Sequence, residues 1–102
     1  MKLFIDTSNR YIIKVGLGEK IFEAEAKQGS SQKLLSFIDE KLKEEGTSIN
    51  QISEIEVNTG PGSFTGLRVG VTMANTLGWA LEVPVNGKNI KDGETVEIKY
   101  ES

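Results

Sequence analysis

Alternating apolar and polar positions divide the first part of the chain into three short strands. Leu3-Phe4-Ile5 is an apolar run that stops at the turn-forming cluster Asp6-Thr7-Ser8-Asn9. Residues 11–17 and 22–26 each alternate apolar side chains with polar ones or glycine, which is typical of half-buried strands. Because short polar turns join the three segments, the pattern predicts an antiparallel meander.

Two later stretches have the apolar spacing of helices. The first begins at Ser30 or Ser31, ends before Gly46 and carries one apolar stripe. The members of that stripe are Leu34, Leu35, Ile38 and Leu42. The second covers residues 66–81, with Thr65 as its predicted cap. Within it, small residues recur every four positions, and this spacing predicts that another helix or a strand approaches closely. Such packing would offset the helix propensity lost at each glycine, about 1 kcal/mol.

The remaining segments complete a mixed sheet. Residues 54–58 predict a fourth strand, Val83-Pro84-Val85 a short fifth strand, and residues 88–100 a terminal hairpin that turns at Asp92-Gly93. Right-handed crossovers then give strand order 3-2-1-4-5 in an α/β fold with both helices on one face. The opposite face is predicted to meet water, because it carries charged residues. These are Lys14, Glu23, Glu25, Glu54 and Glu56.

Composition excludes several kinds of chemistry. The 102 residues contain neither Cys nor His, which excludes disulfides, thiolate nucleophiles, Ser-His-Asp triads and Cys- or His-based zinc sites. The net charge of −3 argues against strong direct binding of nucleic acid. No apolar run is long enough for a membrane span, and the first residues do not have the form of a signal peptide. We therefore expect a cytoplasmic single domain with no metal and no cofactor.

The turn from Gly60 to Gly66 is the first candidate for chemistry, because backbone N–H groups at a helix start bind anions. It matches neither G-x-x-x-x-G-K-[ST] nor G-x-G-x-x-G, so a purely structural role for Gly60, Gly62 and Gly66 is the first interpretation. The alternative is a small anion- or nucleotide-binding enzyme. Its candidate residues are Asp6, Ser63, Thr65 and Arg68.

One side of the second helix is the other candidate. If the apolar residues Leu67, Val71 and Leu77 fill the core, Val69 and Met73 form an exposed apolar patch, which usually marks a partner surface.

Two motifs resemble a known family. They are Leu3-Phe4-Ile5-Asp6-Thr7-Ser8 and Gly60-Pro61-Gly62-Ser63-Phe64-Thr65-Gly66-Leu67-Arg68-Val69-Gly70. Together they resemble the TsaB (YeaZ) family, the non-catalytic subunit of the bacterial machinery that makes threonylcarbamoyladenosine next to the tRNA anticodon. The resemblance covers residues 1–87, and it implies an ASKHA half-domain (actin-like/Hsp70-like, RNase H-like). Residues 88–102 are then expected to form a hairpin in place of a second lobe, within one TsaB-like domain over 1–102.

The resemblance also implies partners. A TsaB-like chain pairs with a catalytic TsaD-like subunit, can form a homodimer, acts alongside a TsaE-like ATPase, and meets tRNA only indirectly through the complex. The family's helical interface maps onto residues 31–45 and 65–81. The candidate interface residues there are Phe37, Val69, Thr72, Met73 and Thr76. No catalytic residue is expected, and the alternatives are the anion-binding enzyme above and a self-associating module outside the tRNA pathway.

Overall fold

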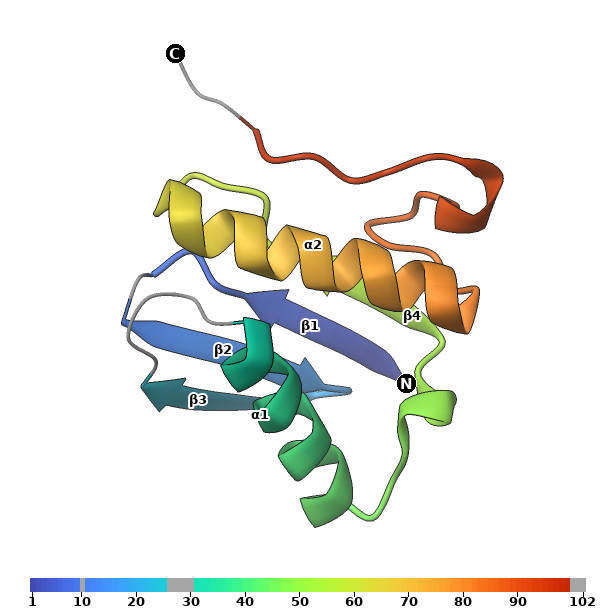
Figure 1. Ribbon diagram of the computed structural model, residues 1–102. Helices are drawn as coiled ribbons and strands as arrows, with labels where there is room; N and C mark the ends of the chain where they lie inside the picture. The colour runs from blue at the N-terminus through green and yellow to red at the C-terminus, as the bar shows by residue number, and fades with distance from the viewer. Residues whose placement is uncertain (10, 26–30, 100–102) are drawn as a thin grey trace.

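Four strands form one mixed sheet at the centre of the molecule. The computed structural model describes residues 1–9, 11–25 and 31–99. Its strands are β1 (Lys2–Asp6), β2 (Ile12–Leu17), β3 (Lys20–Glu25) and β4 (Glu54–Val57). They lie in the order β3-β2-β1-β4, with β1 antiparallel to β2 and parallel to β4 (Figure 1). The predicted meander and the predicted place of the fourth strand are therefore confirmed.

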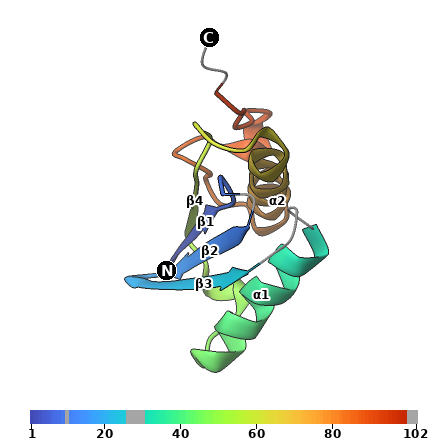
Figure 2. The same cartoon turned by 90° about the vertical axis from the view of Figure 1, so that its left-hand side faces the viewer.

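Both long helices lie on the same face of this sheet. They are α1 (Ser31–Glu44) and α2 (Phe64–Leu81), and the side view shows them together on one side of the strands (Figure 2). Two short 3-10 helices, Ile49–Gln51 and Ile90–Asp92, lie in the connections. The one-sided arrangement follows the alternation in the strands, since only one face of each strand is apolar enough to be covered.

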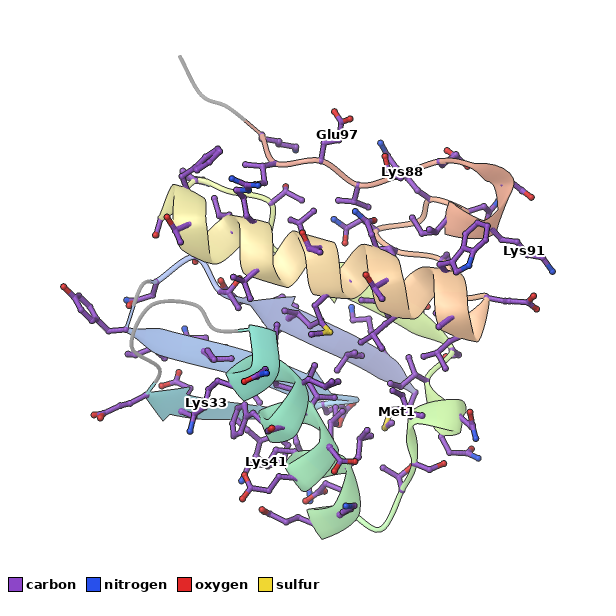
Figure 3. The ribbon with its side chains drawn as sticks, in the orientation of Figure 1. Met1, Lys33, Lys41, Lys88, Lys91 and Glu97 are labelled. Carbon is purple, nitrogen blue, oxygen red and sulfur yellow. The ribbon has the colours of Figure 1, made fainter. Side chains whose placement is uncertain are left out.

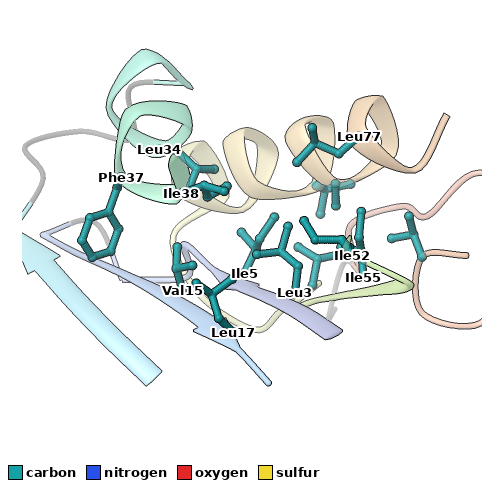
Figure 4. Close-up of a cluster of buried hydrophobic side chains, with 14 of the residues drawn as sticks. Leu3, Ile5, Val15, Leu17, Leu34, Phe37, Ile38, Ile52, Ile55 and Leu77 are labelled. Carbon is teal, nitrogen blue, oxygen red and sulfur yellow. The ribbon is translucent and has the colours of Figure 1, made fainter. Parts of the chain in front are cut away.

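Apolar side chains fill the space between the helices and the sheet (Figure 4). Leu3 and Ile5 of β1 are fully buried there, and Leu34 and Ile38 of α1 and Leu77 of α2 pack onto the same cluster. Removing this apolar surface from water is the main favourable term in folding. The core therefore fixes both helices against the sheet.

Charged side chains occupy the other face of the sheet. Lys2 Nζ lies 2.8 Å from Glu56 Oε1, and Lys14 Nζ lies 3.7 Å from Glu23 Oε2. All four side chains are partly exposed, so each pair contributes little to stability. This face meets water in the described part of the chain, as the alternation predicted.

The predicted fifth strand is not formed among the described residues. Val85 makes an isolated parallel bridge with Ile55 at the edge beyond β4 and an isolated antiparallel bridge with Lys88, and neither extends into a strand. Pro84 has no N–H group, and Asn86 and Gly87 turn the chain at once, with φ angles of 49° and 78°. The Asn86 side chain instead satisfies β4, because its amide accepts from Val57 N at 2.8 Å and donates to Val57 O at 3.0 Å. The sheet therefore has four strands rather than five.

The predicted terminal hairpin is wrong within the described part of the tail, residues 88–99. Asp92 ends a 3-10 turn, and Gly93 follows it with φ of 91°. Residues 94–99 are extended but have no strand partner, and they run along α2 instead (Figure 1). Tyr100, the last position of that prediction, lies outside the described residues.

The helix boundaries differ from the sequence prediction in one respect. The cap of α2 is Ser63 rather than Thr65, and the Ser63 hydroxyl accepts a hydrogen bond from Gly66 N at 3.4 Å. Helix α1 begins at Ser31, whereas Ser30 lies outside the described residues. As predicted, Gly46 ends this helix region in the left-handed conformation, with φ of 69°.

Candidate functional site

A groove of about 600 Å³ runs between α1 and α2 on the surface away from the sheet. We call it the helix groove. Most of its lining comes from one side of α2, and α1 contributes a single leucine. The lining residues are Leu35, Thr65, Arg68, Val69, Thr72, Met73, Thr76 and Leu77. The groove therefore combines an apolar floor with threonine and arginine at its edges.

The structure brings four of the five candidate interface residues together. Val69, Thr72, Met73 and Thr76 all line the helix groove, while Leu67, Val71 and Leu77 of the same helix are buried. Leu67 and Val71 thus face the core on one side of α2, whereas Leu77 is both buried and part of the groove lining.

Phe37 does not line the helix groove. Its side chain is 6% exposed and packs toward the sheet, with Lys41 Nζ 5.4 Å from the ring centroid (Figure 4). The residue that α1 contributes is Leu35, which is 46% exposed and was expected in the buried stripe. The signal for Leu35 is its place around the helix axis, about 100° from Leu34 and about 60° from Ile38, which puts it at the edge of the apolar stripe rather than at its centre.

The small-residue ridge of α2 packs against the end of β1. Thr7 is 2% exposed, and its hydroxyl donates to the carbonyl of Gly66 at 2.5 Å. A Cβ atom at Gly66 would collide with the Thr7 carbonyl, and one at Gly70 would collide with the Thr7 hydroxyl. The close approach predicted for this ridge is therefore made by the sheet, and it seats α2 so that Val69 and Met73 face outward.

Contacts with the β1–β2 connection shape the glycine turn ahead of α2. A Cβ atom at Gly62 would lie 2.6 Å from Ser8 Cβ, and Ser63 N donates to Ser8 O at 2.8 Å. Gly60 has φ of 130°, which side chains rarely adopt, and its N–H donates to Asn58 Oδ1 at 3.0 Å. The Gly60–Pro61 peptide bond is cis. Each of these glycines thus has a steric reason that requires no ligand.

Asp6 is held by its own neighbours at the end of β1. Its Oδ1 accepts from the Ser8 hydroxyl at 2.6 Å, from Ser8 N at 2.9 Å and from Asn58 Nδ2 at 3.2 Å. Partial burial alone would raise the pKa of Asp6, but these hydrogen bonds and the charge of Lys14 lower the pKa below its ordinary value of 3.8. The carboxylate is thus an ionised structural acceptor.

The four anion-site candidates do not line one hollow. Asp6 lines a hollow beside Lys14 and Glu23, whereas Ser63 and Thr65 line a separate one with Ser8, Asn9, Tyr11 and Phe64. Arg68 lines neither of these hollows but shares the helix groove with Thr65, and its Cζ lies 5.7 Å from the centroid of the Phe64 ring. The two hollows share only Ser8 and Asn9, so this arrangement gives an anion no convergent set of donors.

Residues 1–9, 11–25 and 31–99 contain no group of three or more carboxylates placed to hold a metal ion. Over the same residues, no helix is long and apolar enough to cross a lipid bilayer.

Comparison with known proteins agrees with this geometry. A profile of the family described as "TsaD: tRNA N6-adenosine threonylcarbamoyltransferase" matches residues 19–93. The tRNA threonylcarbamoyladenosine biosynthesis protein TsaB of Bacillus subtilis is 36% identical over 88 residues, covering 82% of this chain and 38% of that protein. A tRNA N6-adenosine threonylcarbamoyltransferase of Methanopyrus kandleri is 33% identical over 84 residues, covering 82% of this chain and 24% of that protein.

The same half of the fold occurs in a solved structure. YeaZ from Pseudomonas aeruginosa matches with a TM-score of 0.70 and 26% identity, over 82% of this chain and 41% of that chain. The chain therefore spans 24–41% of the length of these relatives. A meander extended by a parallel strand, with two helices on one face, defines an ASKHA-type half-domain, the lobe of actin-like and Hsp70-like proteins. Within that class, the chain belongs to the TsaB (YeaZ) branch of the family that the TsaD profile describes.

Proposed function

We propose that this chain is a non-catalytic subunit that binds a TsaD-like catalytic protein through the helix groove and serves threonylcarbamoyladenosine formation on tRNA in the cytoplasm. The observation that carries the proposal is the groove itself. Leu35 presents apolar surface there at 46% exposure, and Val69 and Met73, which are partly buried against the core, supply the rest of the apolar lining.

The chemistry of the chain supports a binding role. Its strongest acid candidate, Asp6, accepts three local hydrogen bonds at Oδ1, and Asp6 lines a different hollow from Ser63 and Thr65. A groove with an apolar floor and a polar edge is the surface that protein partners use. A TsaE-like ATPase and a second copy of this chain are further partners within the proposal.

The test is the substitution Met73→Glu in the full chain. We expect it to abolish measurable binding to the purified TsaD-like protein of the same organism in titration calorimetry, because a carboxylate in the apolar floor would be buried without a partner. The matched control is Ile21→Glu, which introduces the same side chain on the uncovered face of the sheet, where Ile21 is 55% exposed.

Four outcomes separate the candidates. Loss of binding with Met73→Glu and retention with Ile21→Glu supports the proposal, whereas equal binding by both variants refutes it. Micromolar binding of ATP, ADP or phosphate by the isolated chain would favour the anion-binding enzyme. A dimer in analytical ultracentrifugation that Met73→Glu dissociates, without any binding of the TsaD-like protein, would favour the self-associating module.

A further inference from the structure

The last described segment of the chain is bound to α2 as an extended peptide. We call residues 94–99 the strap. It runs along the flank of α2 that faces away from α1 (Figure 1). The Asn75 side chain holds it by donating from Nδ2 to Val96 O at 2.9 Å and accepting from Val96 N at 3.1 Å. One amide side chain thus satisfies both backbone groups of Val96, as a neighbouring strand would.

The strap is also anchored at its far end and by apolar contact. Lys99 N donates to Thr59 O at 2.9 Å, which ties the strap to the turn that precedes α2. The Val96 side chain is 5% exposed, and Ile98 is partly buried against the same core cluster. Glu97 between them points away from α2 into solvent (Figure 3). The strap is therefore a fixed part of the surface with alternating inward and outward side chains.

A second hollow lies between α2 and the strap, beside the hydrogen bonds of Asn75 with Val96. It has a volume of about 430 Å³. We call it the strap hollow, and it is lined by Arg68, Val71, Thr72, Asn75, Val96, Glu97 and Ile98. Arg68 and Thr72 line both this hollow and the helix groove. They stand one turn apart on α2 and form a ridge, with the apolar helix groove on one side and the strap hollow, whose lining is both polar and apolar, on the other.

The helix groove alone is too small for a specific protein interface. Eight residues line it, whereas specific interfaces use about 20–30 residues on each side. A partner seated in the groove must therefore cover adjoining surface. Contact with Arg68 and Thr72 brings it to the strap hollow, which begins at those same two residues.

The ridge also defines the charge that the partner presents. No carboxylate in the described part of the chain forms an ion pair with Arg68, whose guanidinium lies over the Phe64 ring. Arg68 is exposed, and the N–H donors of a guanidinium suit a carboxylate in a bidentate pair. The complementary surface is a carboxylate flanked by an apolar projection for the helix groove and a second projection for the mixed lining of the strap hollow.

We propose that the strap is the second wall of the partner surface, so that the partner straddles the Arg68–Thr72 ridge with an apolar projection in the helix groove and a second projection in the strap hollow, where Val96 and Ile98 supply the apolar part of the lining. This inference rests on the proposed function, because the partner is the same TsaD-like protein. It adds a contact region, Val96 to Ile98, that lies outside both helices.

The experiment compares two substitutions in the strap of the full chain. Ile98→Asp places a charge in the strap hollow, whereas Thr95→Asp places the same charge at an exposed position outside both hollows. We expect Ile98→Asp to weaken binding of the TsaD-like protein at least about ten-fold and Thr95→Asp to change it less than about two-fold. Far-UV circular dichroism and thermal unfolding verify that both variants are folded at the titration temperature.

A second measurement avoids any change in apolar packing. Because the chain has no cysteine, Glu97→Cys creates a single thiol on the outward side of the strap. We expect saturating partner to slow its alkylation at least about ten-fold, as burial in a complex slows access of the reagent. The matched control is Ile21→Cys, whose single thiol lies on the uncovered face of the sheet. We expect saturating partner to leave the alkylation rate of this thiol unchanged.

The outcomes distinguish this inference from the proposed function. Equal binding by Ile98→Asp and Thr95→Asp, with an unprotected thiol at position 97, overturns the role of the strap while Met73→Glu still abolishes binding. Tighter binding by Ile98→Asp also overturns it, because the strap would then cover the partner surface. If Met73→Glu itself has no effect, the proposed function fails and this inference fails with it.

Discussion

Single atoms decide how closely α2 approaches the sheet. Gly70 lies against the Thr7 hydroxyl. A Cβ atom added at Gly70 would collide with that hydroxyl and would lie 3.4 Å from Ile5 Cγ2. In an isolated helix, alanine is favoured over glycine by about 1 kcal/mol. In this protein the added methyl group would meet a buried side chain that has no room to move, since Thr7 is 2% exposed. For the substitution Gly70→Ala, packing therefore predicts a loss of stability, whereas helix propensity predicts a gain.

We predict that Gly70→Ala lowers the free energy of unfolding by about 1–3 kcal/mol, the usual effect of overpacking. Urea unfolding followed by circular dichroism measures it. The control is Thr72→Ala on the exposed side of the same helix, which we expect to leave stability unchanged or slightly higher. A stabilised Gly70→Ala variant would mean that helix propensity, and not contact with Thr7, governs this position.

Asp6 gives the protein a defined dependence on acid. Because the pKa of Asp6 in the folded protein lies below 3.8, its hydrogen bonds stabilise the fold fully above that pH. This stabilisation is lost as the pH falls through the folded pKa. We predict that Asp6→Asn is less stable than the parent at pH 7 and that the difference shrinks below about pH 3.8. Urea titrations from pH 7 to pH 2 measure the difference, and a gap that stays constant throughout would contradict the role of the charge.

Two adjacent leucines of helix α1 lie in different environments. Leu34 is 0% exposed and packs into the core, whereas its neighbour Leu35 is 46% exposed and lines the helix groove. Since consecutive residues of a helix point about 100° apart, the two side chains cannot share one environment. The element as a whole is thus both a core layer and one wall of the candidate site.

These two positions provide a matched pair of substitutions. Leu35→Asp is expected to leave the thermal unfolding midpoint within about 3 °C of the parent, because its side chain is exposed, and to weaken partner binding at least about ten-fold. Leu34→Asp is expected to prevent folding, because a buried carboxylate would have no partner. Calorimetry and circular dichroism measure both. Unchanged binding by a folded Leu35→Asp variant would remove α1 from the partner surface.

At the scale of the whole molecule, local patterns predicted the layers but not the final pairings. Alternation and helical spacing were enough to predict β1 to β4, both helices and the one-sided sheet, because each depends on a periodicity within one segment. The fifth strand and the hairpin depend on what a segment pairs with. The alternation of Val96 and Ile98 is satisfied by the flank of α2, far away in sequence, and no local signal specifies that partner.

The candidate site was predictable to a similar extent. Assigning Leu67, Val71 and Leu77 to the core predicted an exposed patch at Val69 and Met73, and both of these residues line the helix groove. The residue that α1 contributes to the groove is Leu35, which the sequence placed in the buried stripe, because a stripe of four apolar positions left the rotation of the helix undetermined by one position. Phe37 instead became part of the core.

The parallel pairing of β1 with β4 has a consequence for how the chain folds. Strands β1, β2 and β3 are neighbours in sequence and can pair through short loops, but Lys2 meets Glu54 only after the whole meander and α1 have been enclosed in one loop. Closing a long loop costs more chain entropy before any contact offsets it. The meander is therefore the part of the sheet that can form first, and the arrival of β4, which brings α2 and its groove into place, is the late step that completes the molecule.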